Sequence, residues 1–404
     1  MKDTFLLHIN EGARSGSRIF YAPLKGFSKI IETEEDIASA MKEASALPNR
    51  NIYHISADPD EFRTLMVLPN NKCNFHCAYC YSAKGRSNTE MTSMMLRKAL
   101  EWFITPKRLP GKKLTLIYIG GGEPLLSWPV VKESISYALE LNAKREGDIY
   151  ISIVTNCSII NEDIIQFCLN TNAGICASYD ILEDVQNKLR GHYDQVTANI
   201  NEYSSRGVDV GLTTVITEDN IHRMKEMVQV MKQAIPLVKQ VQFKPLVPDE
   251  SFVKFASKDD YYKAFVDEFF EAKALADKEG IRLTCPYFNA VSVLQDRFCE
   301  GKFVLAADGN ITGCNFVSSP LEKQFDTFKT GYTNEDGVSI DEDSVKRIFS
   351  HNNDLEICND CSAKYHCAGG CYADHVYMSQ DDKEAYCRAM RLFLTKYLIL
   401  KNLT

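Results

Sequence analysis

The chain has 404 residues, of which 45% are apolar and 25% are charged, and its formal net charge is −8. These proportions are those of a globular protein, and they exclude a disordered or collagen-like chain. The acidic net charge gives no basic patch for binding nucleic acid, so we expect no nucleic-acid partner. No apolar run approaches the ~20 residues that span a bilayer, so we also expect no membrane partner. The 14 cysteines are unusual. Disulfide scaffolds are short and core-poor, so the thiols are expected to be reduced and the protein cytoplasmic.

Residues 1–62 have a mixed pattern that predicts a small α+β region. The stretches Phe5–His8 and Arg18–Tyr21 predict a strand pair. Thr33, followed by three acidic residues, predicts the start of a helix that extends to about Ala46, because a hydroxyl cap and acidic first-turn residues stabilise a helix N-terminus.

Residues 63–250 alternate between apolar runs and stretches with helical spacing. The runs that predict strands are Thr64–Leu68, Leu114–Ile119, Ile149–Val154, Gly174–Ser178, Asp209–Ile216 and Val241–Leu246. The stretches that predict helices are Met91–Phe103, Val130–Leu141, Asp163–Leu169, Val185–Tyr203 and Ile221–Met231. Apolar runs alternating with helices are typical of a buried parallel sheet, so the expected fold class is α/β, a partial (β/α)6 TIM-like barrel. In such barrels the chemistry occurs at the carboxyl ends of the strands.

The last third of the chain loses this alternation. Residues 251–284 are expected to form a bridging helix, about Asp259–Lys278, and a strand. Residues 285–404 are rich in turns and contain eight of the cysteines, and a final helix is expected over about Lys383–Leu400.

The first group of cysteines, Cys73-x3-Cys77-x2-Cys80, directly follows the first expected barrel strand. A loop this short lets three thiolates converge on one metal centre. A 4Fe–4S cluster has four irons, so three cysteine ligands leave one iron open. A zinc site completed by His76 is the alternative, although structural zinc sites usually pair their cysteines differently.

This spacing, with Tyr79 before the last cysteine, resembles the signature of the radical S-adenosylmethionine (SAM) superfamily. Gly120-Gly121-Gly122-Glu123-Pro124, after the second strand, resembles the loop that holds the amino group of SAM in that family. Ser178-Tyr179-Asp180 is similar to a further family motif, although Ile181 replaces its glycine. The resemblance implies that SAM is a cofactor and assigns it to Tyr79, Gly121, Gly122, Glu123, Pro124, Ser152, Asn156, Ser178, Arg190 and Val215. A strand-end cap or a surface charge is the alternative for the less specific of these positions.

Seven cysteines of the C-terminal region match the SPASM extension of radical SAM peptide maturases. The resemblance implies two auxiliary 4Fe–4S clusters, and therefore three [4Fe-4S] clusters in all. It assigns Cys358, Cys361, Cys367 and Cys387 to the cluster farther from the barrel and Cys299, Cys314 and Cys371 to the nearer one. Cys285 is the upstream candidate for a fourth ligand of the nearer cluster, and an open iron is the alternative. Cys157, Cys168 and Cys176 are interpreted as core residues.

The resemblance implies an enzyme that cleaves SAM to a 5′-deoxyadenosyl radical and modifies a peptide. We expect a maturase that installs a thioether or C–C crosslink in a ribosomally made precursor peptide, with a flavodoxin or ferredoxin as reductant. Phe20–Gly26 resembles the N-terminal hairpin of such enzymes, and a separate leader-binding protein is the alternative to leader binding by residues 1–62. An anaerobic sulfatase maturase is the second hypothesis, but Asn315 stands where those enzymes carry an aspartate base. A non-enzymatic iron–sulfur electron carrier is the hypothesis from another class.

Overall fold

The computed structural model describes residues 3–10, 15–246, 257–352 and 354–403, and its main feature is one continuous sheet of eleven strands. Along the sheet the order is β10 (Arg282–Thr284), β9 (Gln240–Pro245), β8 (Val210–Ile216), β7 (Gly174–Ser178), β6 (Ile149–Thr155), β5 (Leu114–Tyr118), β4 (Thr64–Val67), β11 (Lys302–Leu305), β12 (Asn310–Thr312), β13 (Lys329–Thr333) and β14 (Val338–Ile340). Neighbouring strands from β10 to β11 are parallel, and those from β11 to β14 are antiparallel.

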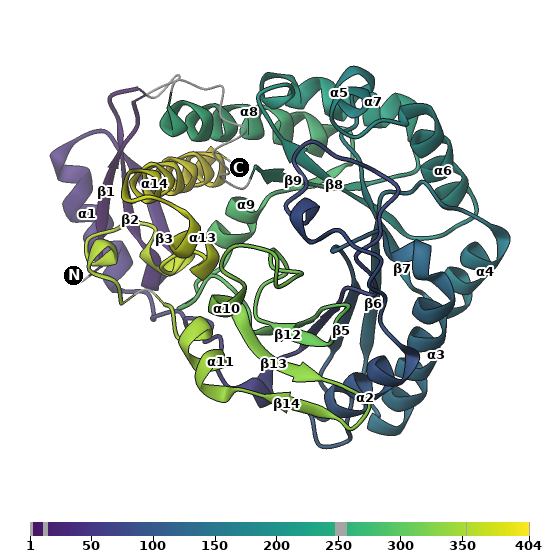
Figure 1. The fold of residues 1–404 in the computed structure, drawn as a ribbon. Coiled ribbons are helices and arrows are strands. Elements are labelled where there is room, and N and C mark those ends of the chain that lie inside the picture. Colours follow the sequence, from purple (N-terminus) through teal and green to yellow (C-terminus); the bar gives the residue numbers. More distant parts are fainter. Residues whose placement is uncertain (1–2, 11–14, 247–256, 353, 404) are drawn as a thin grey trace.

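Helices between the parallel strands cover the outside of the curved sheet (Figure 1). They are α2 (Ser93–Phe103), α3 (Trp128–Arg145), α4 (Glu162–Thr171), α5 (Glu183–Leu189), α6 (Tyr193–Ser205) and α7 (Met224–Ala234). Side chains alternate between the two faces of each strand, so Ile175 and Ala177 of β7 are buried beneath the helices while Cys176 and Ser178 lie partly exposed on the inner face.

The α/β class and the six expected barrel strands, β4 to β9, are confirmed. The sheet stays open between β10 and β14 in the described part of the chain. The single helix expected over Val185–Tyr203 is wrong, since α5 and α6 are separated by a turn in which Gly191 and His192 have positive φ angles of 84° and 60°. Helical spacing continues across this turn, so the apolar pattern alone hides the break.

The C-terminal cysteine region adds strands to the barrel sheet. β11 pairs in parallel with β4, and β12 to β14 extend the sheet from there. The turn-rich sequence does not predict this pairing, because β11 and β4 are far apart in the chain. The remaining helices of this region are α9 (Pro286–Val291), α10 (Phe325–Phe328), α11 (Glu342–Phe349), α12 (Lys364–Cys367) and α13 (Tyr372–Tyr377).

A second sheet lies at the N-terminus, where β1 (Phe5–His8), β2 (Arg18–Ala22) and β3 (Phe27–Ile31) are antiparallel and are followed by α1 (Glu34–Ser45). The expected strand pair therefore forms the first two strands of a three-stranded sheet. The terminal helix α14 (Gln380–Leu403) packs against β2, β3 and α8 (Lys258–Lys278), which joins this sheet to the rest of the protein (Figure 1). Among the described residues, no helix is both long enough and apolar enough to span a membrane.

Candidate functional site

The loop after β4 carries Cys73, Cys77 and Cys80, all three partly exposed. Two backbone hydrogen bonds brace it, from Ala78 N to Leu189 O at 2.8 Å and from Cys80 N to Cys77 O at 3.2 Å. The loop lies at the carboxyl end of the parallel strands, where β5, β6 and β7 also end. The structure therefore places the three thiols where active sites of α/β barrels form.

The three thiols share one electrostatic environment. Burial raises the pKa of the Cys77 thiol, Arg190 opposes this shift, and the neighbouring thiols of Cys80 and Cys73 reinforce it. Arg86 donates a hydrogen bond from Nη2 to the sulfur of Cys80 at 3.1 Å. The sulfurs are therefore close enough to repel one another as thiolates, and cations surround them.

Two buried donors beside these thiols have no hydrogen-bond partner in the described part of the chain: Arg86 Nη1 and Arg190 Nε. Leaving such groups unpaired is costly, and it is typical of a site whose ligand supplies the acceptor. A cluster with a bound carboxylate fits this donor set. Among the described residues no three His, Cys, Asp or Glu side chains converge as they would on a single metal ion.

The Gly120–Pro124 loop packs directly against the cysteine loop. A Cβ atom on Gly122 would lie 1.9 Å from Lys72 O, and Gly121 has a φ of 73°. Only glycine tolerates such an approach, so these two residues let the loops after β4 and β5 touch. Pro124 follows as the buried first residue of a short 3-10 helix, Pro124–Ser127.

The Glu123 side chain is buried and faces the end of β6. Its carboxylate accepts hydrogen bonds from Thr155 Oγ1 at 2.6 Å, Asn156 N at 2.7 Å and Leu125 N at 3.0 Å. Burial raises the pKa of Glu123, and these hydrogen bonds oppose that shift. In this structure Glu123 therefore positions Asn156, and the glycine backbone is the part of the loop that contacts the cysteine loop, at Lys72.

Asn156 is brought to the cysteine loop and Ser152 is not. The Asn156 amide donates to Asn74 Oδ1 at 2.9 Å and lies 4.0 Å from the sulfur of Cys73. Ser152 lies in the middle of β6, beside Ile117 and Gly174 of the neighbouring strands. It is three residues below the strand end at which Asn156 meets the thiols.

A polar network connects the cysteine loop to the ends of β7 and β8. Tyr79 donates its hydroxyl proton to Asp180, with distances of 2.8 and 2.7 Å to the two carboxylate oxygens. Arg190 donates to the Tyr79 oxygen at 3.2 Å. Burial raises the pKa of Asp180, while Arg190 and a hydrogen bond from the backbone of Val215 lower it. Ser178 lies two residues before Asp180, partly exposed at the end of β7.

Cys299, Cys314 and Cys371 line a second site, a recess beside the barrel. Lys302 donates from Nζ to the sulfur of Cys299 at 3.1 Å. Arg297 also lines the recess, and its buried Nε and Nη1 have no partner among the described residues. Three thiols facing unpaired donors in one recess fit an anionic cluster here as well.

Four of the five remaining cysteines of the C-terminal region form a third group: Cys358, Cys361, Cys367 and Cys387. The neighbouring thiols of Cys387, Cys361 and Cys358 add to the effect of burial in raising the pKa of Cys367. Burial raises the pKa of Cys358 to about 11, and Cys361 and Cys387 reinforce this shift. The structure thus brings together the four residues that the sequence resemblance grouped.

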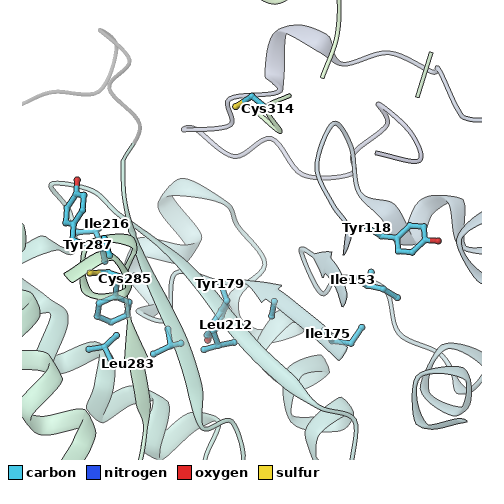
Figure 2. Close-up of a cluster of buried hydrophobic side chains, with 14 of the residues drawn as sticks. Tyr118, Ile153, Ile175, Tyr179, Leu212, Ile216, Leu283, Cys285, Tyr287 and Cys314 are labelled. Atoms are coloured by element: carbon cyan, nitrogen blue, oxygen red, sulfur yellow. The ribbon is translucent and has the colours of Figure 1, made fainter. Parts of the chain in front are cut away.

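Cys285 is not brought to either group. Its thiol accepts a hydrogen bond from Phe288 N at 3.3 Å and caps the start of α9. Figure 2 shows Cys285 among Ile216, Leu283 and Tyr287, well apart from Cys314. It does not line the recess of Cys299, so the structure does not support its assignment as a fourth ligand there.

Of the three cysteines interpreted as core residues, Cys157 and Cys168 are fully buried, at 0% and 2% exposure. Cys176 differs, because it lies partly exposed on the inner face of β7, 3.3 Å from Thr213 Oγ1.

Tyr81 was missed in the sequence, and it links the first two cysteine sites. Its hydroxyl hydrogen-bonds to the side chain of Asn315, and its ring packs edge-on against Phe316 at 5.0 Å between centroids. Its position directly after Cys80 is the available signal. Arg86, Arg297 and Lys302 were also missed, since isolated basic residues carry no pattern.

Comparison with known proteins agrees with this arrangement. Residues 67–231 match the model of the radical SAM superfamily, and so form a radical SAM domain. A cysteine-type anaerobic sulfatase-maturating enzyme of Clostridium novyi is 23% identical over 364 residues, which cover 82% of this chain and 94% of the relative.

Two solved structures share the fold over most of the chain. The structure titled native anSMEcpe with bound AdoMet and Cp18Cys peptide matches with a TM-score of 0.67 at 16% identity, covering 84% of this chain and 98% of the other. Streptococcus suis SuiB bound to precursor peptide SuiA matches with a TM-score of 0.56 at 15% identity, covering 90% and 82%.

Proposed function

Because residues 67–231 form a radical SAM domain, we propose that this chain is a radical SAM enzyme that modifies a peptide. The observation that carries the proposal is the meeting of Cys73, Cys77 and Cys80 with the glycine loop and with the unpaired donors of Arg86 and Arg190. An electron carrier has no need of buried donors left unpaired for a second ligand beside its cluster, so this arrangement favours the enzyme over the carrier.

At the first site, different residues of the chain would bind the cluster, orient SAM and exclude water. Cys73, Cys77 and Cys80 would hold a 4Fe–4S cluster, and that cluster with SAM would supply a 5′-deoxyadenosyl radical. Asn156, 4.0 Å from the sulfur of Cys73, and Arg190, which donates to Tyr79, would orient SAM. The buried strand ends around Asp180 and Glu123 would exclude water from the reacting groups.

A peptide substrate is supported by the titles of the similar structures, which record a bound peptide for anSMEcpe and a precursor peptide for SuiB. We propose a ribosomally made precursor peptide that receives a thioether or C–C crosslink. A flavodoxin or ferredoxin would supply electrons in the cytoplasm. The leader would bind at residues 1–62 or on a separate protein.

Sulfatase maturation is the second candidate, because the Clostridium novyi relative bears that name. Asn315, which stands where an aspartate base is expected in those enzymes, argues against this candidate. An amide cannot accept a proton as a carboxylate does, and here the Asn315 side chain is engaged by Tyr81.

The proposal is tested on anaerobically purified protein reduced with dithionite. The wild type should cleave SAM to 5′-deoxyadenosine, and a Cys77→Ala variant should not. Wild-type iron and sulfide should each approach about twelve per chain, since three clusters hold four irons each. If protein with its full complement of iron–sulfur clusters does not cleave SAM, the proposal that the chain is a radical SAM enzyme is refuted. Conversion of a sulfatase-derived cysteine peptide to an aldehyde would decide for the second candidate.

A further inference from the structure

Lys302 carries a cation into the recess of Cys299, Cys314 and Cys371. It is the first residue of β11, which pairs with Thr64 of β4, so the sheet itself holds its position. Its Nζ lies 3.1 Å from the sulfur of Cys299, within hydrogen-bond reach. The Lys302 side chain is therefore directed at a predicted cluster ligand.

Arg297 adds a second cation to the same recess. It is only 7% exposed, and its Nε and Nη1 are buried without a hydrogen-bond partner among the described residues. The described residues that line the recess include no Asp or Glu. Three thiolates would thus face two cations in the recess, while the buried Asp374 carboxyl group, which does not line it, acts on Cys314 and Cys371 through charge at a distance.

The group of Cys358, Cys361, Cys367 and Cys387 has a different charge balance. It contributes four thiolates, and the cations near it, Lys364, Arg388 and Arg391, act on Cys358 and Cys387 through charge at a distance. In the described part of the chain no lysine or arginine donates a hydrogen bond to these four sulfurs within 4.0 Å.

We infer that Lys302 and Arg297 raise the reduction potential of the nearer auxiliary cluster, which makes it the better electron acceptor of the two. The inference rests on the proposed function, which supplies the clusters. Reduction adds one negative charge to a cluster, and nearby cations and hydrogen bonds to its sulfurs favour the reduced form. The electron would come from the substrate radical, which is oxidised as its proton leaves to solvent, and the cluster would be reduced by one electron.

The test is an EPR-monitored redox titration of the full-length, fully loaded protein without substrate. Lys302→Met should move the midpoint of one auxiliary cluster to a more negative potential, and Lys302→Arg should retain most of the wild-type value. Lys329→Met is the matched control, since Lys329 is also the first residue of a strand in this part of the sheet but is exposed. It should leave all midpoints unchanged.

Arg297→Met provides a second, independent variant and should shift the same midpoint in the same direction. An unchanged or more positive midpoint in both variants, with full iron content, would overturn the inference. If Lys302→Met loses four irons, it no longer holds the cluster whose potential is measured. The midpoint of Arg297→Met then decides whether the inference stands. Wild-type iron near four per chain would instead refute the proposed cluster assignment, so the two failures are distinguishable.

Discussion

Tyr81 directly follows the last cysteine of the first site, and its hydroxyl is hydrogen-bonded to Asn315, which directly follows Cys314 of the second site. Tyr81 as a whole residue is 39% exposed, but burial of its hydroxyl raises its pKa to about 12. One side-chain contact therefore connects the loops of two predicted clusters.

A double-mutant cycle tests this connection. Tyr81→Phe keeps the ring against Phe316 but removes the hydrogen bond, and Asn315→Ala removes the same bond from the other side. Each variant should lose about 0.5–1.5 kcal/mol of unfolding free energy. The double variant should lose little more than either single variant, because both remove one interaction. Fully additive losses in anaerobic denaturation would show that the bond contributes nothing.

Arg190 should be essential for the stability of the barrel end. Arg190→Met removes the cation that lowers the pKa of Asp180 and leaves that buried carboxylate with hydrogen bonds from Tyr79 and the Val215 backbone only, so a loss of about 3–5 kcal/mol of unfolding free energy is expected. Lys188→Met is the control, since the Lys188 side chain, two residues before Arg190 in the last turn of α5, is 54% exposed and pairs with Asp219 at 2.6 Å. It should change stability by less than about 1 kcal/mol. Equal effects in thermal denaturation would contradict the buried network.

Cys285 should be dispensable for metal binding. Cys285→Ala is expected to retain about twelve irons per chain, whereas Cys371→Ala should lose about four. The Cys285→Ala protein should still lose stability, because the thiol fills a buried site and caps α9. Iron analysis and thermal denaturation of the same samples check both statements. A loss of four irons from Cys285→Ala would restore it as a ligand.

His366 should make stability depend on pH. Its Nε2 lies 2.5 Å from the Tyr21 hydroxyl and its Nδ1 lies 2.6 Å from Val293 O. A carbonyl only accepts, so the proton is on Nδ1 and the neutral ring accepts from Tyr21. Burial lowers the pKa of His366 from its ordinary value of 6.5.

The sign of the effect follows from that lowered pKa. Below pH 6.5 the unfolded chain binds a proton at this histidine that the folded chain does not. The contribution of His366 to the free energy of unfolding is therefore complete above this pH and decreases as the pH falls. His366→Gln should flatten this dependence between pH 7 and 5. His351 and His375, whose pKa values burial also lowers, should preserve part of it. An unchanged slope in His366→Gln would contradict the assignment.

The sequence alone determined the features that depend on neighbours in the chain. Apolar runs located β4 to β9, and the spacing of Cys73, Cys77 and Cys80 located the first site, because a short loop brings its own residues together. The Thr33 cap also lies where expected, at the start of α1. These elements follow from local geometry, which periodicity and spacing report directly.

Only the tertiary structure decided which distant groups meet. It placed Lys302 on Cys299 through the pairing of β11 with β4, turned the Glu123 carboxylate toward Asn156, and left Cys285 in the core. A thiol has the same sequence signature whether it binds iron or fills a cavity. The difference lies in the surroundings, which packing of elements far apart in the chain creates.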